Sequence, residues 1–538
     1  MRKFNILFFN EFMNFIMQKK SWLFLLFVVI AFAGCKENEP IVDNEHYEEA
    51  RPPEKETGTP VLRFLSFSFN KSLNPELTED IRGTIVDDKI TVLLPETAVD
   101  LQLNLIPSFI GEYKSVEVAG KTQTSGVTAQ DFNQVITYVL TSEKGTVKTY
   151  QVTVKIFTGI PIVWIETENR QAITSKEDYV NGTVTISRTP PFTEGYEGSM
   201  RIKGRGNATW TYPKKPYRIK LDSKSKILGM PSDKDWVLLA DYCDKSLLRT
   251  TYAFELSKLM ELPWTPRGYH VEVFLNGSYN GTYFLGEHVK VASNRANIAD
   301  DGYLIENDNN WEKEPIWFTT SRGLHFTFKH PDTDDMVRGD ENYNFILNYM
   351  NEFETVLYSD HFADPNNGYR KYIDAESFAK WYLLQETLGN AEPNPYYVLQ
   401  SRTGKLEMYP AWDFEWSLGI AFRKNNAWIL PPATSPVAHL YHRNIYFSRL
   451  LQDQYFADIV KQEWIKVKSH LPTLTDIISD KSENIRYAQS KNFSRWEILG
   501  KYISVGLVKF DTWEEEVDYA KEFLDARVEW LDSEISNW

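Results

Sequence analysis

Cysteine and positive charge are both scarce in this chain of 538 residues. It has two cysteines, Cys35 and Cys243, which excludes a disulfide framework and a zinc site built from several thiolates. Asp and Glu outnumber Lys and Arg by 74 to 59, giving a formal net charge of −15. Such a surface repels phosphate polyanions, so we expect no general binding of nucleic acid. Any anion that binds must find a local basic patch.

The apolar run near the start of the chain is too short to span a membrane. It covers the 13 residues of Trp22–Gly34, whereas a spanning helix needs about 20. The run follows Lys19-Lys20 and ends in Phe-Ala-Gly-Cys35, a pattern typical of a secretory signal. The ending resembles a bacterial lipobox, although an ordinary signal peptide with an incidental cysteine is the alternative.

We therefore expect residues 1–35 to be a lipoprotein signal peptide, with Cys35 as the lipidated residue. Residues 36–60 are polar, acidic and proline-bearing, which is typical of a flexible tether. The lipid would anchor the protein in the outer membrane or at the cell surface.

Residues 61–157 consist of short runs with strand periodicity and no helical pattern. Turn-forming residues such as Asp87-Asp88 and Glu143–Gly145 separate these runs. The pattern predicts an all-β immunoglobulin-like sandwich that serves as a spacer or adhesion module. The predicted strands lie within 61–69, 89–94, 101–105, 134–140 and 149–156.

Residues 158–538 have a β-rich half followed by an α-rich half, which predicts a two-lobed α+β domain. Strand patterns dominate up to about residue 330, with one helix expected at Lys245–Met260 and Asp244 at its N-cap. Beyond about 340 the pattern is largely helical. The last helix has one apolar face, formed by Val517, Ala520, Leu524, Val528, Leu531 and Ile535.

A first group of chemically interesting residues is basic. Arg201-Ile-Lys-Gly-Arg-Gly-Asn-Ala-Thr-Trp210 is followed by Lys214-Lys-Pro-Tyr-Arg-Ile-Lys-Leu221. If both are strands, alternation puts Arg201, Lys203 and Arg205 on one face of the first strand. On the second strand it puts Arg218 and Lys220 on the side opposite Tyr217, Ile219 and Leu221. Neighbouring like charges destabilise a sheet unless an anion or acidic partners lie among them. In an acidic protein this predicts a site for a phosphate or carboxylate. Gly204 and Gly206 would let the backbone approach that anion closely. The alternative is a solvated face paired with internal acids.

A second group is acidic and follows a predicted hairpin. Asp413 and Glu415 lie among Trp412, Phe414 and Trp416, and carboxylates in such surroundings are paired, metal-bound or protonated. On a strand, spacing two would point both to one face, as metal ligands require. Asn390, Glu392 and Asn394 precede the hairpin and could face the same cleft, and Mg²⁺ favours such oxygens together with phosphates. The alternative is a buried Asp beside an exposed Glu.

Other enzyme classes fit less well. Asp-x-Glu also ends a chitinase motif, but the upstream aspartates of that motif are replaced here by Met408 and Ala411. Neither Gly-x-Ser-x-Gly nor His-Glu-x-x-His occurs, so a serine hydrolase elbow and a common zinc-protease motif are absent from the sequence.

Taken in order along the chain, these motifs resemble the spore-coat protein H (CotH) kinase family. The resemblance covers about 380 residues, and the combination of motifs is specific although each piece alone is not. The matching pieces are Arg205-Gly-Asn-Ala-Thr-Trp210, Lys214–Lys220, Leu228-Gly229, Lys234–Ala240, Asp244–Arg249, Val271–Gly277, Gly281–Glu287 and Trp412-Asp-Phe-Glu415.

The resemblance implies an atypical protein-kinase fold that transfers the γ-phosphate of ATP, with Mg²⁺ or Mn²⁺, to Ser or Thr of a protein at the cell envelope. It implies that Lys220 or Lys215 takes the lysine role, with Arg205 and Arg218 also at the phosphates. Asp413 would bind metal, with Glu415 and Asn394 as further ligands, and Glu392 would stand at the catalytic Asp position.

Two features of the chain keep a second function open. Family members commonly carry Asp-x-Asp where this chain has Asp413-Phe-Glu415, and Asp where it has Glu392. A longer side chain shifts the carboxylate oxygens, and phosphoryl transfer depends on position. An envelope protein also meets little ATP. The alternative is therefore a weak or inactive kinase-like scaffold that binds a protein or glycan.

Overall fold

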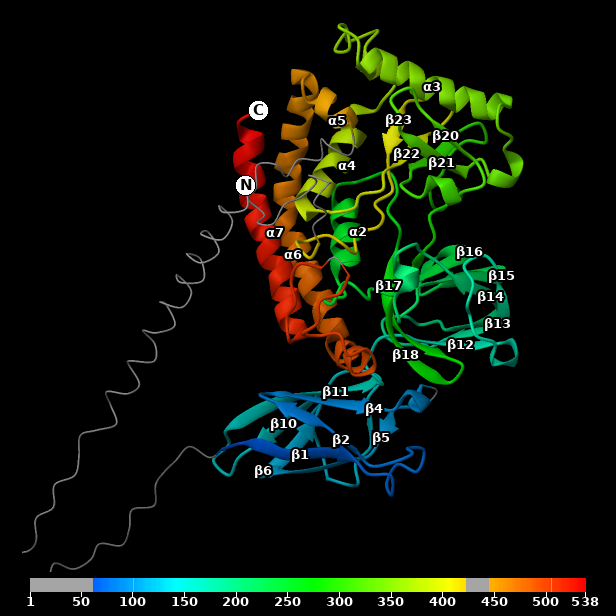
Figure 1. The fold of residues 1–538 in the computed structure, drawn as a ribbon. Helices are drawn as coiled ribbons and strands as arrows, with labels where there is room; N and C mark the ends of the chain where they lie inside the picture. The colour runs from blue at the N-terminus through cyan, green and yellow to red at the C-terminus, as the bar shows by residue number, and fades with distance from the viewer. Residues whose placement is uncertain (1–60, 100, 422–444, 505) are drawn as a thin grey trace, which may run out of the picture. The chain divides into compact units, whose positions relative to one another are not determined.

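The structure, a computed structural model, describes residues 61–99, 101–421, 445–504 and 506–538 (Figure 1). The predicted signal peptide with Cys35 and the predicted tether lie outside these residues. Within the described ranges, no helix combines the length and apolar character needed to cross a membrane.

Residues 61–157 form two main β-sheets that share one apolar core, as the strand periodicity predicts. Phe67 and Phe69 from one sheet and Val92, Tyr138 and Val152 from the other are all completely buried. The immunoglobulin-like character of this module stays a prediction. The sheets have the orders β2 (Ile81–Arg82), β1 (Arg63–Phe69), β6 (Pro107–Glu112), and β3 (Thr84–Val86), β4 (Lys89–Leu94), β11 (Val147–Ile156), β10 (Ile136–Thr141), β7 (Ser115–Val118), β8 (Lys121–Thr122); β5 (Asn104–Leu105) pairs with β9 (Gln130–Asp131).

The next part of the chain is a closed β-barrel. Its strands alternate between buried and exposed side chains, so Ile202 of one strand and Ile219 of the next face the interior. Parallel pairing of the first strand with the seventh in the ring closes the barrel, with Val163 opposite Val273. Periodicity predicted the strands but not this closure. The barrel order is β12 (Ile162–Thr167), β13 (Val180–Ile186), β14 (Tyr196–Gly204), β15 (Tyr217–Ile227), β16 (Met230–Leu239), β18 (Ser278–Glu287), β17 (Gly268–Leu275).

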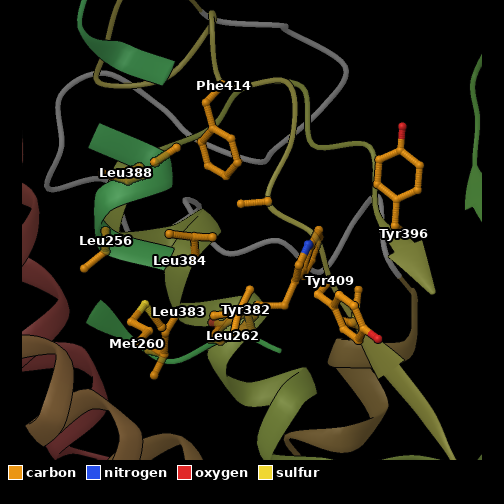
Figure 2. Packing of buried hydrophobic residues seen from close by; sticks show 14 of the residues in the cluster. Leu256, Met260, Leu262, Tyr382, Leu383, Leu384, Leu388, Tyr396, Tyr409 and Phe414 are labelled. Carbon is orange, nitrogen blue, oxygen red and sulfur yellow. The ribbon is translucent and has the colours of Figure 1, made fainter. Parts of the chain in front are cut away.

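Beyond the barrel lie a five-stranded sheet and a group of helices that share the largest apolar core. Side chains from different helices, such as Leu256 and Leu384, meet in this core together with Phe414 (Figure 2). The sheet has the order β20 (Trp317–Thr319), β21 (His325–His330), β19 (Tyr303–Asn307), β22 (Tyr396–Leu399), β23 (Leu406–Met408). The helices are α2 (Arg249–Leu259), α3 (Glu341–Leu357), α4 (Ala375–Leu388), α5 (Ile445–Leu450), α6 (Gln454–Arg495) and α7 (Trp513–Ser536).

Helix α7 is as predicted, with Ala520, Leu524 and Leu531 buried along one face. A capping box between Thr512 and Glu515 starts the helix. Helices α4, α6 and α7 pack against one another, and Figure 1 shows them running side by side.

The predicted start of helix α2 is wrong. The helix begins at Arg249 rather than Lys245, and Asp244 does not cap it. Instead, the Asp244 carboxylate accepts hydrogen bonds from the Ser246 and Arg249 backbone nitrogens at 3.0 and 2.8 Å. These bonds close a separate turn over residues 244–248, so Asp244 organises the approach to the helix.

His270 makes the stability of this part of the protein depend on pH. It is 7% exposed, and burial lowers its pKa to about 4. The neutral imidazole is favoured in the fold, so its contribution is complete above pH ~6.5 and falls by up to about 3 kcal/mol as the pH drops to ~4. We expect the stability difference between wild type and His270→Gln to shrink over this range in denaturant titrations. A difference independent of pH would contradict this.

Candidate active site

A basic face lies on the outside of the barrel. Strand β14 pairs antiparallel with β15, placing Arg201 opposite Lys220 and Lys203 opposite Arg218. Part of this charge is balanced within the protein, because Arg218 forms an ion pair with Asp235 at 2.9 Å. Arg201 and Lys203 both lie over the ring of Tyr179, at 5.3 and 4.9 Å from its centroid. Asp235 is thus an internal acidic partner of this face, and the anion site stays a prediction.

Unsatisfied polar atoms accompany the basic face. Arg218 Nε and His288 Nδ1 are buried, and neither has a hydrogen-bond partner among the described residues. Burial and the charges of Arg218 and Arg205 hold the pKa of His288 well below its usual range. Buried polar atoms without partners are costly, and an anionic oxygen would satisfy Arg218 Nε, and His288 Nδ1 in the tautomer that carries its proton there.

Arg205 connects the basic face with the acidic group. Its guanidinium lies over the Trp412 ring at 5.5 Å from the ring centre. Burial lowers its pKa, while the negative charge of Asp413 acts in the opposite direction. The two groups of residues that the sequence singled out, over 200 positions apart, therefore meet at Arg205 and Asp413.

The glycines beside Arg205 have a structural role. A Cβ on Gly204 would lie 2.4 Å from the Trp210 ring, and Gly206 has a φ of +78° that favours glycine. These positions therefore admit the Trp210 ring and a tight turn, and their approach to an anion stays a prediction.

The two adjacent lysines point to different surroundings. Lys215 Nζ donates to the Trp210 backbone oxygen at 2.7 Å. Lys214 is 1% exposed, and its Nζ donates to the Thr282 oxygen and to Asn492 Oδ1. Burial lowers the pKa of Lys214 to about 8. Sequence reasoning did not separate these two residues, since only the packing of β18 and α6 makes one of them buried.

The acidic segment is not a strand, so that prediction is wrong. Strand β23 ends at Met408, and Asp413 has a φ of +65° in the left-handed region. Asp413 is exposed, and its Oδ2 accepts a hydrogen bond from Asn394 Nδ2 at 2.8 Å. Glu415 accepts from the Cys243 backbone nitrogen at 3.0 Å. The two carboxylates therefore have different partners rather than one common face.

The charge of Asp413 nevertheless affects the pKa of Glu415. Burial, reinforced by the negative charges of Asp413 and Asp244, raises the pKa of Glu415 to about 7. Its backbone bond from Cys243 and the ammonium of Lys214 oppose this shift.

The loop before β22 ties the remaining candidates together. Asn390 is fully buried, and its Nδ2 donates to Gln385 Oε1 at 3.0 Å and to the Asp413 backbone oxygen at 3.1 Å. The Glu392 backbone nitrogen donates to Asn390 Oδ1 at 3.1 Å. The Glu392 side chain on the same loop is half-buried. Asn390 thus acts as a positioning residue, whereas the sequence suggested that it faces the cleft.

A second acidic group, which sequence reasoning missed, adjoins Asp413. Glu306 of β19 lies opposite Tyr396 of β22 and pairs with Lys329 at 3.0 Å. Burial raises the pKa of Glu306, with Asp308 and Asp413 adding to the shift. Ordinary strand alternation gives no signal for this residue, because only sheet pairing brings it to the site.

Arg249 binds the backbone that follows the acidic segment. Its Nε donates to the Ser417 oxygen at 2.8 Å, and its Nη1 contacts Asp244 at 2.5 Å with both side chains at most 1% exposed. Arg249 thereby joins the first turn of α2 to the residues that follow Asp413.

The donor types at Asp413 fit a hard divalent cation that is shared with phosphates. Mg²⁺ is usually held by one or two carboxylates plus substrate oxygens, and Asp413 with the Asn394 amide offers such donors. The part of the chain that the structure describes has no group of three or more His, Cys, Asp or Glu side chains able to hold a metal ion.

Residues 201–531 match the family described as CotH kinase protein. The match covers more than half of the chain, so the protein belongs to the CotH kinase family. None of the curated proteins matches it.

Replacing Arg249 tests how far the acidic segment depends on it. We expect Arg249→Met to lower the free energy of unfolding by about 3–5 kcal/mol, because it leaves Asp244 charged and buried. The matched control is Lys258→Met on the same helix, whose pair with Glu255 is partly exposed and contributes under about 1 kcal/mol. Denaturant titration followed by tryptophan fluorescence measures both, and equal losses would contradict the anchoring role.

Proposed function

We propose that this protein is an atypical protein kinase that transfers the γ-phosphate of ATP to Ser or Thr of a cell-envelope protein. The observation that supports it most is the approach of Arg205, from the barrel, to the Trp412 ring, beside Asp413, which Asn394 holds. Phosphoryl transfer depends on positioning and on cations around the phosphates, with little covalent chemistry by the protein. ATP with Mg²⁺ or Mn²⁺ would supply the phosphoryl group and neutralise its charge.

On the barrel side, Arg205 and Arg218 would hold the phosphates. Arg218 Nε and His288 Nδ1 offer the unsatisfied polar atoms for phosphate oxygens. Lys220, beside Arg201 on the same face, would extend this positive charge. Lys215, whose Nζ is bound to the Trp210 oxygen, would act by fixing the loop after Arg205.

On the opposite side, Asp413 and Asn394 would hold the metal, with Glu415 as a further ligand. Glu392 would orient the acceptor hydroxyl and accept its proton. Asn390 supports these two roles, since it accepts a hydrogen bond from the Glu392 backbone nitrogen and donates one to the Asp413 backbone oxygen. A shift of the loop would move both groups together.

We further propose that the protein is lipid-anchored through Cys35 in the outer membrane or at the cell surface. The module at 61–157 would be an immunoglobulin-like spacer or adhesion module between the anchor and the kinase domain. The protein substrate would then lie within reach of the membrane, and nucleic acid would not be a partner.

A kinase-like scaffold is the second candidate function. The contact of Glu415 with Cys243 favours it, because this carboxylate is already bonded to backbone and has a pKa raised to about 7. A scaffold would depend on its exposed surface or on the module at 61–157, and would tolerate loss of the Asp413 charge.

Nucleotide binding separates the two functions. We expect ATP with Mg²⁺ or Mn²⁺ to raise the melting temperature of the full-length protein, and Asp413→Asn to abolish this increase while leaving the unliganded protein folded. The reason is that the amide retains the shape but loses the charge that holds the cation.

The matched control is Asp518→Asn, an exposed site on α7. It should keep the nucleotide-dependent increase in full. No increase at millimolar ATP with metal would contradict the kinase proposal and leave the scaffold.

Removing the barrel cation should weaken ATP binding. We expect Arg205→Met to raise the dissociation constant about tenfold or more, since a hydrogen bond to a charged group contributes ~1.5–3 kcal/mol. The exposed Arg82→Met in the N-terminal module is the control. Isothermal titration with ATP and Mg²⁺ measures both, and an unchanged affinity for Arg205→Met would exclude this residue from the phosphate site.

A further inference from the structure

A cavity of about 130 Å³ lies beside helix α2. Strand β17, helix α2, helix α6 and the loop at Pro190-Pro191 contribute to its wall. Phe254 of α2 lines it, and the same ring also stacks on Trp412 at a centroid distance of 6.1 Å. The cavity is therefore separate from the candidate active site and lies one aromatic layer behind it.

Most of the wall is apolar. Ile160, Phe192, Phe284 and Ile485 line the cavity together with Phe254. Its volume is of the order of the ~150 Å³ apolar cavity that accommodates benzene in another protein. A monocyclic ring or a short branched chain is the size that fits.

Two polar groups of the wall could receive a ligand, a buried hydroxyl without a partner and a half-exposed lysine. Thr251 is 4% exposed, and its Oγ1 is buried with no hydrogen-bond partner in the described part of the chain. The Lys481 ammonium lies 5.5 Å from the centre of the Tyr269 ring, and no described acidic side chain forms an ion pair with it. A buried hydroxyl and an unpaired ammonium beside an apolar wall both favour a ligand with an anionic oxygen.

The other charged groups of the wall leave the balance positive. Glu255 is paired with Lys258 at 3.0 Å, so these two charges cancel. His270 Nε2 is engaged with the Leu247 oxygen at 2.7 Å. Lys481 therefore contributes the net charge of the cavity.

We propose that this cavity binds a small aromatic carboxylate, with its ring against Phe254 and Phe284 and its carboxylate toward Lys481 and Thr251. The site is independent of the proposed kinase activity. A pocket of this kind, largely apolar with a few convergent polar groups, is the usual form of a small-molecule site.

Benzoate is the probe, titrated into full-length protein without nucleotide by isothermal calorimetry. We expect saturable binding of one equivalent, and binding of the neutral isostere benzamide about tenfold weaker or more. Lys481→Met should weaken benzoate by a similar factor, and Thr251→Val should weaken it without removing it.

Lys521→Met, which removes an exposed lysine of α7, is the matched control for charge and should leave the affinity unchanged. Equal affinity for benzoate and benzamide, an equal effect of Lys481→Met and Lys521→Met, or no binding at millimolar benzoate would each overturn the proposal. Because ATP is absent, none of these outcomes depends on whether the protein is an active kinase.

Discussion

The candidate site depends on one buried ion pair, between Asp244 and Arg249. Its two charges lie where water cannot solvate them, so each is stable only while the other is present. The remaining Arg249 donors reach the Ser417 and Leu418 oxygens, and Asp244 holds the turn that precedes α2. This single pair therefore joins the chain that follows β16, the start of α2 and the segment that carries Asp413. Asn390 bonds the Asp413 backbone oxygen itself, so the left-handed backbone at Asp413 has hydrogen bonds at it and after it.

A second buried cation connects the barrel with the helical part. Lys214 donates to a carbonyl oxygen of β18 and to Asn492 of α6, so it replaces water by two fixed acceptors. Asn492 also accepts from the Thr282 nitrogen, and Gly281 leaves no room for a Cβ beside it. Close packing at this point holds β18 against α6, although the two are far apart in the sequence.

Positive charge is concentrated on one face of the barrel, although the chain as a whole is acidic. Its net charge is −15, yet Arg201, Lys203, Arg218 and Lys220 share one face of the barrel. A local field of this kind attracts a phosphate ligand that the whole protein would repel. The two departures expected from the family pattern, Glu392 and Glu415, both lie on the acidic side, and the Glu415 carboxylate bonds to backbone. The cations of β14 and β15 are thus paired across one face, whereas Asp413 and Glu415 have different partners.

Sequence alone determined the local features of this protein. Alternation predicted β14 and β15 with their basic face, three- and four-residue spacing predicted α7, and the motif order identified the family. Tertiary structure decided what depends on distant partners. Closure of the barrel needs β12 beside β17, burial of Lys214 rather than Lys215 needs α6, and the separation of Asp413 from Glu415 needs Asn394 and Cys243. These outcomes come from long-range hydrogen bonds and desolvation, which a periodic pattern does not encode because they depend on residues far away in the chain.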